Sequence, residues 1–389
     1  MKLQKLIIPF ILILPMVFAS CIDRFYMNGS GTGFTPKLVI EGIITTDGEM
    51  QEIVISESAP TDKPEFSPLS GCNVRVEDDH GNSISFHESI AGHYRGIINR
   101  NFINVGSHYR LTLQIPDGKQ YKSNYEELMP CPEIDSVYYE LKSKPTKDSE
   151  VPENGLQFYI DYKGNQNSGH YYRWKQVETY EYHSTWPITR YMDQYGEHQL
   201  RRADYSFFTC YKTEELRDIF TLSTLRLTQN SYKRYALHFV NDHTQRLMHK
   251  YSVLVKQYSL TESAYNFWNN LRKNNKEADD LFEKQPAMVK GNIYNVNDSS
   301  EVVLGYFGVS SVSAKRIIVP GVSELAFSEV HYCTVTPPPE GPLPEERPLY
   351  WAQGIDQYGE PFWGYGDSEC FICTLLGGTT QKPPYWDKQ

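Results

Sequence analysis

Three strand–turn–strand patterns near the N-terminus constrain the fold more than any other feature of this chain. Residues 37–58 read KLVIEGII, then a turn with Asp47–Gly48, then QEIVISES. Asp-Gly between two alternating apolar runs is a hairpin signal. The pattern recurs around the turns at 80–82 and 116–118. Hairpins at this spacing predict an immunoglobulin-like β-sandwich over residues 36–128.

Residues 129–335 are expected to form a second, larger β-rich domain. Two prolines around Cys131 favour an extended junction at its start. The longest alternating segment, HYYRWKQVETYEYH at 170–183, is typical of an antiparallel sheet with one solvated face. The sequence therefore predicts a mainly β protein built from antiparallel sheets.

One helix is expected within this second domain, near residues 261–273. Ser259 and Glu262 have the spacing of a capping box, which makes Glu262 a helix cap rather than a general acid. Phe267 and Trp268 fall on or beside the apolar stripe that follows, and we expect them to pack on the sheet, with a ligand site as the alternative. A shorter helix is predicted over 213–220 (TEELRDIF).

The last segment, 336–389, has a different character. It begins with the proline-rich TPPPEGPLPEERP, which favours an extended conformation, and ends with CFICTLLGGTTQKPPYW. We expect a proline-rich strap followed by a cysteine-containing tail that lies back over the second domain.

The N-terminus has the layout of a bacterial lipoprotein signal. Lys2 and Lys5 precede a short apolar run, and small residues precede Cys21. We predict a signal peptide over 1–20, acylation of Cys21, and a lipidated Gly/Ser-containing tether over 21–35. The alternative is an ordinary signal peptide followed by an incidental cysteine. The apolar run is shorter than the ~20 residues that span a bilayer, so the chain is expected to be anchored to the membrane without spanning it.

Six cysteines remain when Cys21 is set aside. An even number in an exported chain indicates disulfides, and six cysteines allow fifteen pairings. The alternatives are a zinc site, for which His331 beside Cys333 is the local candidate, or redox chemistry of the CxxC sequence. The disulfide candidates are Cys72, Cys131, Cys210, Cys333, Cys370 and Cys373.

Charge and composition limit the partners. The formal net charge is −10, and no basic patch suited to phosphates is present, so we expect no nucleic-acid partner. The chain contains 29 Tyr, 18 Phe and 6 Trp. Such residues most often belong to half-buried sheets, and the alternative is a binding interface.

The common catalytic spacings are missing from the sequence. There is no HExxH, GxSxG, Walker loop, SxxK or GxGxxG. The densest polar set is His238, Asp242, His243 and His249, which we interpret as polar turn residues rather than as metal ligands. We therefore predict no catalytic residues, no metal and no cofactor.

Three segments resemble the DUF4249 family of Bacteroidota outer-membrane lipoproteins. They are 132–140 (PEIDSVYYE), 259–319 with its ordered QP, GNI and GYF elements, and the closing CFICTLLGGTTQKPPYW. The chain departs from the family pattern around Ile372 and Thr374. The resemblance implies no assigned activity, but it implies a gene neighbourhood with TonB-dependent outer-membrane receptors.

These observations together predict a non-enzymatic accessory lipoprotein that captures ligand for a TonB-dependent transporter. A surface adhesin or structural module is the alternative, followed by a hydrolase with an unrecognised site. The expected location is the outer membrane, through a lipid anchor. Asp23 behind Cys21 favours the cell surface, with the periplasmic face as the other option. The sequence does not identify the ligand.

Overall fold

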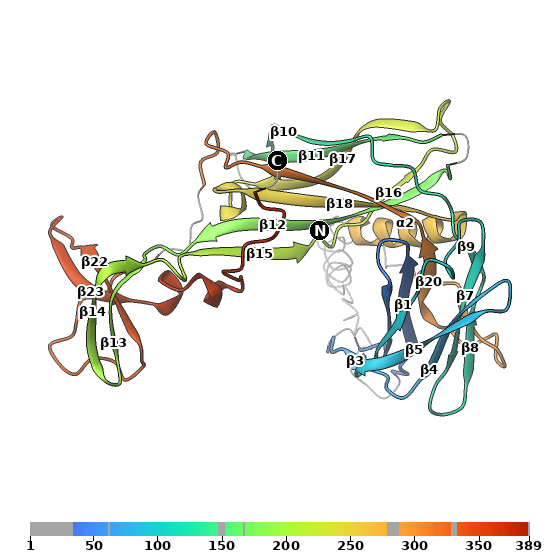
Figure 1. The fold of residues 1–389 in the computed structure, drawn as a ribbon, viewed down its shortest axis with the longest axis horizontal. Helices are drawn as coiled ribbons and strands as arrows, with labels where there is room; N and C mark the ends of the chain where they lie inside the picture. The colour runs from blue at the N-terminus through green and yellow to red at the C-terminus, as the bar shows by residue number, and fades with distance from the viewer. Residues whose placement is uncertain are drawn as a thin grey trace, which may run out of the picture.

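The fold consists of two β-sandwiches and a projecting β-sheet arm (Figure 1). The computed structural model of the chain describes residues 34–60, 63–146, 152–165, 168–277, 288–327 and 333–387. These residues form four sheets, and the chain is mainly β with antiparallel pairing, as predicted. The predicted signal peptide, Cys21 and the tether up to residue 33 lie outside the described residues.

The first sandwich is a single sheet that folds on itself. Its strand order is β19-β8-β7-β4-β5-β6-β2-β1-β20, with β3 beside β2 and β9 beside β7. All three predicted hairpins are present, as β1–β2, β4–β5 and β7–β8. The strands are β1 (Leu38–Thr45), β2 (Met50–Glu57), β3 (Ser67–Pro68), β4 (Asn73–Asp78), β5 (Ser83–Ile90), β6 (His93–Ile97), β7 (His108–Gln114), β8 (Gln120–Ser123), β9 (Glu126–Glu127), β19 (Ile293–Asn295) and β20 (Leu304–Ser310).

Strand β5 makes the turn between the two layers of this sandwich. Its first half pairs with β4 and its second half pairs with β6, so it passes from one layer to the other. Alternate residues of each layer point inward, as the buried–exposed alternation of β1 and β7 shows. The shared core contains Ile40, Val76, Leu111 and Phe307.

The second sandwich packs a sheet of β10-β11-β17 against a sheet of β15-β12-β18-β21, with β16 beside β12. Its core includes Phe158, Trp174, Tyr251 and Val255. Its elements are β10 (Ser136–Lys144), β11 (Glu153–Lys163), β12 (Tyr171–His183), β15 (Thr209–Glu215), β16 (Phe220–Ser223), β17 (Ser231–Asn241), η2 (Gln245–Leu247), β18 (Tyr251–Ser259), α2 (Glu262–Glu277) and β21 (Val312–Val319).

The arm is a small sheet of order β14-β13-β22-β23 that extends to the left in Figure 1. It consists of β13 (Ile188–Asp193), β14 (Gly196–Asp204), β22 (Leu349–Ile355) and β23 (Pro361–Gly366), followed by the short helices η3 (Ser368–Cys370) and η4 (Cys373–Leu376). Its core contains Ile188, Tyr350 and Phe371.

The last residues return to the second sandwich. Thr379 pairs with Tyr211 of β15, and the buried Trp386 donates a hydrogen bond from Nε1 to Glu181 of β12 (3.0 Å). The tail therefore lies over one face of this sandwich, in the manner that its sequence suggested.

The structure differs from the sequence interpretation at several points. The helix expected over 213–220 is wrong: these residues belong to β15, a loop and the start of β16. Residues 293–310, expected in the second domain, pair in the first sandwich as β19 and β20, and β20 runs parallel to β1. The segment 336–389 contains β22 and β23, which we did not expect because the segment is rich in proline. The specifically immunoglobulin-like arrangement of the first sandwich stays a prediction.

Candidate functional site

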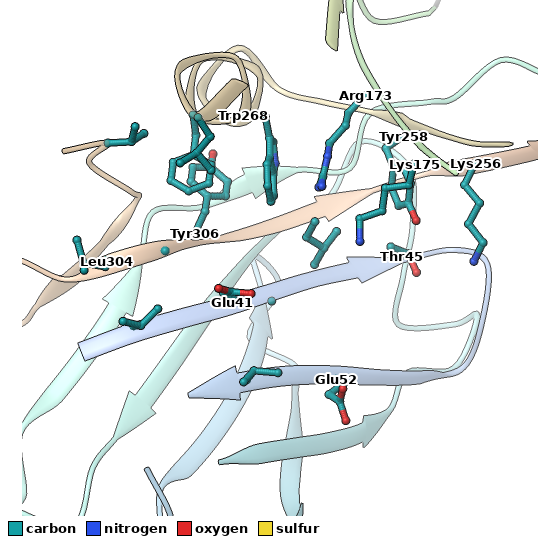
Figure 2. A pocket seen from close by; sticks show the side chains of 18 of the residues that line it. Glu41, Thr45, Glu52, Arg173, Lys175, Lys256, Tyr258, Trp268, Leu304 and Tyr306 are labelled. Atoms are coloured by element: carbon teal, nitrogen blue, oxygen red, sulfur yellow. The ribbon is translucent and has the colours of Figure 1, made fainter. Parts of the chain in front are cut away.

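A cavity of about 740 Å³ lies where the first sandwich meets helix α2 and the outer face of β12 and β18. We call it the inter-sandwich cavity. One wall is formed by β1, β2 and β20, and the opposite wall by α2, β12 and β18 (Figure 2). Its volume is within the usual range for small-molecule sites, ~300–1,000 Å³.

Helix α2 supplies the apolar side of this cavity. It begins after Thr261, whose hydroxyl accepts a hydrogen bond from the backbone N–H of Ala264 (3.2 Å). Thr261 therefore caps the helix, and the predicted Ser259–Glu262 capping box is wrong, because Ser259 donates its hydroxyl proton to the Met129 carbonyl instead. The helix itself, expected near 261–273, is confirmed.

Phe267 and Trp268 pack helix α2, as expected, and their rings also reach the cavity. Phe267 stacks on Tyr306 of β20 with ring centroids 4.7 Å apart, so it joins α2 to the first sandwich. Both residues also line the cavity, together with Leu271. The aromatic pair therefore packs the helix and forms part of a potential binding surface.

Glu126 connects the elements around this wall. Its side chain, 2% exposed, accepts hydrogen bonds from the Thr261 cap, from the Tyr306 hydroxyl and from the Asn292 amide. Burial raises the pKa of Glu126, although these donors act in the opposite direction. A single carboxyl group thus fixes the start of α2 relative to β9 and β20.

Arg173 of β12 is the most unusual residue in the cavity. It is 6% exposed, and its guanidinium lies 3.5 Å above the centre of the Trp268 ring. Its Nε and Nη1 atoms are buried, and neither has a hydrogen-bond partner among the described residues. Burial lowers the pKa of Arg173 to about 10, so the group is still charged at neutral pH. An unpaired buried charge is costly.

Two lysines lie on the same side of the cavity as Arg173, and each already has a carboxylate partner. Lys175 binds Glu215 at 2.6 Å. Lys256 binds Asp47 in the β1–β2 turn at 2.7 Å, which links the two sandwiches. Burial raises the pKa of Asp47, but hydrogen bonds from Lys256 and Thr45 outweigh it and lower the pKa overall. Figure 2 shows Arg173 and Lys175 pointing toward β1.

The chemistry of this lining suits binding. The described lining residues include no serine, cysteine or histidine, which are the commonest nucleophiles and general bases. Two of the three lining carboxylates are paired, Asp47 with Lys256 and Glu52 with Arg95. The third, Glu41 of β1, is exposed, lines the cavity and has no ion pair among the described residues. The cavity therefore offers an apolar surface with a buried arginine on β12 and an exposed carboxylate on the facing strand β1.

Four of the six predicted disulfide cysteines form bonds, and they do so across long separations. Cys210 pairs with Cys373 and Cys333 pairs with Cys370, so the two cysteines of the CxxC sequence have different partners. Zinc ligation by Cys333 is incompatible with its bond to Cys370, and His331 lies outside the described residues.

Cys72 and Cys131 form no disulfide with any described cysteine. The Cys72 backbone N–H donates to the Tyr94 hydroxyl (3.0 Å), and the Cys131 thiol contacts the Gln257 carbonyl (3.4 Å). Burial raises the pKa of both thiols, that of Cys131 to about 11. Their inclusion among the disulfide candidates is therefore not supported by the structure.

The polar set His238, Asp242, His243 and His249 does not converge on one site. His238 is buried in the second sandwich, His243 lies 3.8 Å from both Glu153 and Asp242, and His249 stacks on His183. In the described part of the chain, no group of three or more His, Cys, Asp or Glu residues is arranged to hold a metal ion.

His238 makes the stability of the second sandwich dependent on pH. Its ring stacks on Phe158, and Nε2 lies 3.0 Å from the Tyr251 hydroxyl, which itself donates to Glu178. Nε2 must therefore carry the proton, and Nδ1 has no hydrogen-bond partner in the part of the chain that the structure describes. Burial lowers the pKa of His238 to about 3, because a second proton would be buried without an acceptor.

We expect the free energy of unfolding to fall by about 2 kcal/mol between pH 7 and pH 5 through His238 alone. The unfolded histidine takes up a proton near pH 6.5, whereas the folded one does so only near pH 3, so stability is lost as the pH falls. Urea titrations of the wild type and of His238→Gln at both pH values measure the difference. Equal pH dependence in the two proteins would contradict the prediction.

Sequence patterns gave little indication of the cavity. Arg173 and Lys175 alternate with aromatic residues in the strand predicted over 170–183, so their common face could be read from the sequence. That this face meets the first sandwich could not be read, since the contact depends on β20 pairing with β1.

Comparisons with known proteins identify a family without a known function. No helix in the described residues is both long and apolar enough to cross a membrane. A comparison with curated proteins found no match to the chain. Among solved structures, it is similar to trypsin-activated alpha-2-macroglobulin from Escherichia coli (12% identity, TM-score 0.18). This match covers 61% of the chain and 15% of that protein.

A second solved structure, the M60 catalytic domain with two CBM51 domains from Clostridium perfringens ZmpB, has 8% identity and a TM-score of 0.12. This match covers 86% of the chain and 45% of that structure. The chain thus spans less than half the length of either protein. The model of a domain of unknown function, DUF4249, matches residues 24–316. The chain belongs to the DUF4249 family.

Proposed function

We propose that this protein is a non-enzymatic, lipid-anchored protein of the outer membrane that captures a ligand for a TonB-dependent transporter. Acyl chains on Cys21 would hold it in the plane of the membrane. Confinement raises the effective concentration of a bound ligand next to the transporter, without any new contact between the two proteins.

The observation that carries this proposal is the inter-sandwich cavity. It combines apolar walls with the unpaired Arg173, and its described lining lacks the common nucleophiles and histidine bases. Such a cavity favours reversible binding over group transfer. The signal-like N-terminus supports the anchored location.

Purification of the tagged full-length chain from the membranes of its native cells tests the proposal. We expect a protein of outer-membrane transporter size to co-purify with the wild type after mild detergent extraction. The Cys21→Ser variant should leave the membrane fraction and lose this partner. Membrane association that survives Cys21→Ser, or a wild type that never co-purifies with a barrel protein, would refute the anchored accessory role.

The tips of the arm favour a second candidate, an adhesin-like surface module. Tyr195 at the β13–β14 turn is 83% exposed, and Tyr358 at the β22–β23 turn is 81% exposed. Exposed tyrosines supply rigid contact area for a protein or glycan. Binding of the full chain to purified matrix proteins or glycans, lost in Tyr195→Ser/Tyr358→Ser and retained in Tyr125→Ser, would support this role over transport.

A further inference from the structure

We propose that the inter-sandwich cavity binds an organic anion, in which a carboxylate or phosphate group is carried on an apolar body, and that Arg173 is its anchor. The inference rests on the proposed capture function, because it identifies the class of ligand that is captured.

The other two cations among the described lining residues are each paired with a carboxylate. Lys175 is bound to Glu215, and Lys256 is bound to Asp47. The Glu215 carboxylate acts electrostatically on Arg173, and it is already engaged by Lys175. Arg173 therefore has a full positive charge, its buried Nε and Nη1 have no hydrogen-bond partner among the described residues, and it forms no ion pair with any carboxylate of that part of the chain. An incoming anion would supply the missing partner.

The position of the guanidinium is fixed before a ligand arrives. Trp268 covers one face of the group, and the cross-strand neighbour of Arg173 is Tyr258 of β18. Trp268 is in turn held by α2, whose start is fixed through Thr261 and Glu126. A preorganised arginine loses little conformational entropy when it binds carboxylate or phosphate oxygens.

The other lining residues of the cavity determine which kind of chemical group carries the anionic head of the ligand. The wall opposite Arg173 carries the aliphatic side chains of Val39, Ile43 and Val54 beside the exposed carboxylate of Glu41, and α2 adds the apolar Phe267 and Leu271. A small inorganic anion would leave this surface in contact with water, whereas an aromatic or aliphatic acid would cover it. The complementarity therefore points to an amphiphilic acid.

Calorimetry with defined probes tests the inference. The full-length chain, reconstituted in lipid nanodiscs, is titrated with 2-naphthoate, 2-naphthyl phosphate, neutral 2-naphthamide and inorganic phosphate, with subtraction of empty nanodiscs. We expect one or both naphthyl anions to bind at least about tenfold more tightly than 2-naphthamide and inorganic phosphate. The stronger of the two identifies the preferred head group.

The Arg173→Met variant should abolish this preference for the anions. The matched control is Arg316→Met, which removes an arginine stacked 3.6 Å above another aromatic ring, that of Tyr385, outside the cavity. Because methionine replaces an unpaired buried charge, Arg173→Met should also melt at or above the wild-type temperature without ligand. A large fall in its melting temperature would assign Arg173 a structural role instead.

The outcomes separate this inference from the proposed function. Equal binding of naphthyl anions and amide, unchanged by Arg173→Met, would overturn the role of Arg173. If none of the probes binds, the proposal that the cavity binds organic anions is wrong. Co-purification with a transporter does not depend on Arg173, so it can succeed while this inference fails, and the reverse is equally possible.

Discussion

Replacing Cys210 and Cys373 by alanine should lower the free energy of unfolding by about 5 kcal/mol, the largest effect we expect from any local change. The bond joins residues 163 positions apart, and in the chain-entropy description the stabilisation grows with the length of the closed loop. Both cysteines are fully buried, so alanine avoids placing a serine hydroxyl in the core. Urea unfolding under non-reducing conditions measures the loss.

The second disulfide provides the matched control. Cys333 and Cys370 are only 37 positions apart, and their removal should cost about 4 kcal/mol. Limited proteolysis separates the two variants more sharply. Cleavage between residues 377 and 387 should accelerate only without the Cys210–Cys373 bond, which holds the tail near β15. Cleavage at the wild-type rate in the variant without the Cys210–Cys373 bond would contradict this and would show that contacts such as Trp386 packing retain the tail.

Arg246→Met should lower the free energy of unfolding by about 3 kcal/mol. Glu178 of β12 is 2% exposed, and Arg246 donates from Nη1 to both of its carboxylate oxygens, at 3.1 and 3.3 Å. The Tyr251 hydroxyl also donates a hydrogen bond to Glu178, at 2.7 Å. Without Arg246, the described residues leave the Glu178 carboxylate in the core with one neutral donor. Chemical denaturation at pH 7 measures the effect.

A double variant and a surface variant serve as controls for Arg246→Met. Arg246→Met/Glu178→Gln removes both charges and should recover part of the lost stability. Arg95→Met breaks the Arg95–Glu52 pair of similar length (2.8 Å) in a solvent-exposed position and should cost less than about 1 kcal/mol. If Arg246→Met costs no more than Arg95→Met, the buried network does not stabilise the second sandwich.

The hairpins of the first sandwich were predicted correctly because their information is local. Asp47–Gly48 lies between two runs with a period of two, so turn chemistry and burial pattern agree over twenty residues. The information that predicts helix α2 is also local, since the apolar stripe of the helix repeats at helical spacing. Its cap was misassigned by two residues, because Ser259 found a tertiary acceptor at Met129 and Thr261 took its place.

The segment 213–220 shows how tertiary structure overrides local preference. TEELRDIF contains good helix formers, yet residues 209–215 pair with β12 over its whole second half. Cross-strand pairing next to the buried Tyr180 and Tyr182 outweighs a weak helix propensity. The arm was not predicted because its pairing is also non-local. Strand β22 pairs with β13, which lies more than 150 positions earlier in the chain.

By itself, the sequence determined that this is a β protein, which segments form its hairpins, where its helix lies and that some of its cysteines can pair. These properties depend on neighbours within about twenty residues. Tertiary structure decided which cysteines pair, that β20 joins β1, and that two buried nitrogens of Arg173 have no partner among the residues the structure describes. Those properties depend on residues far apart in the chain, and a buried charge can be recognised as unpaired only when everything around it has been placed.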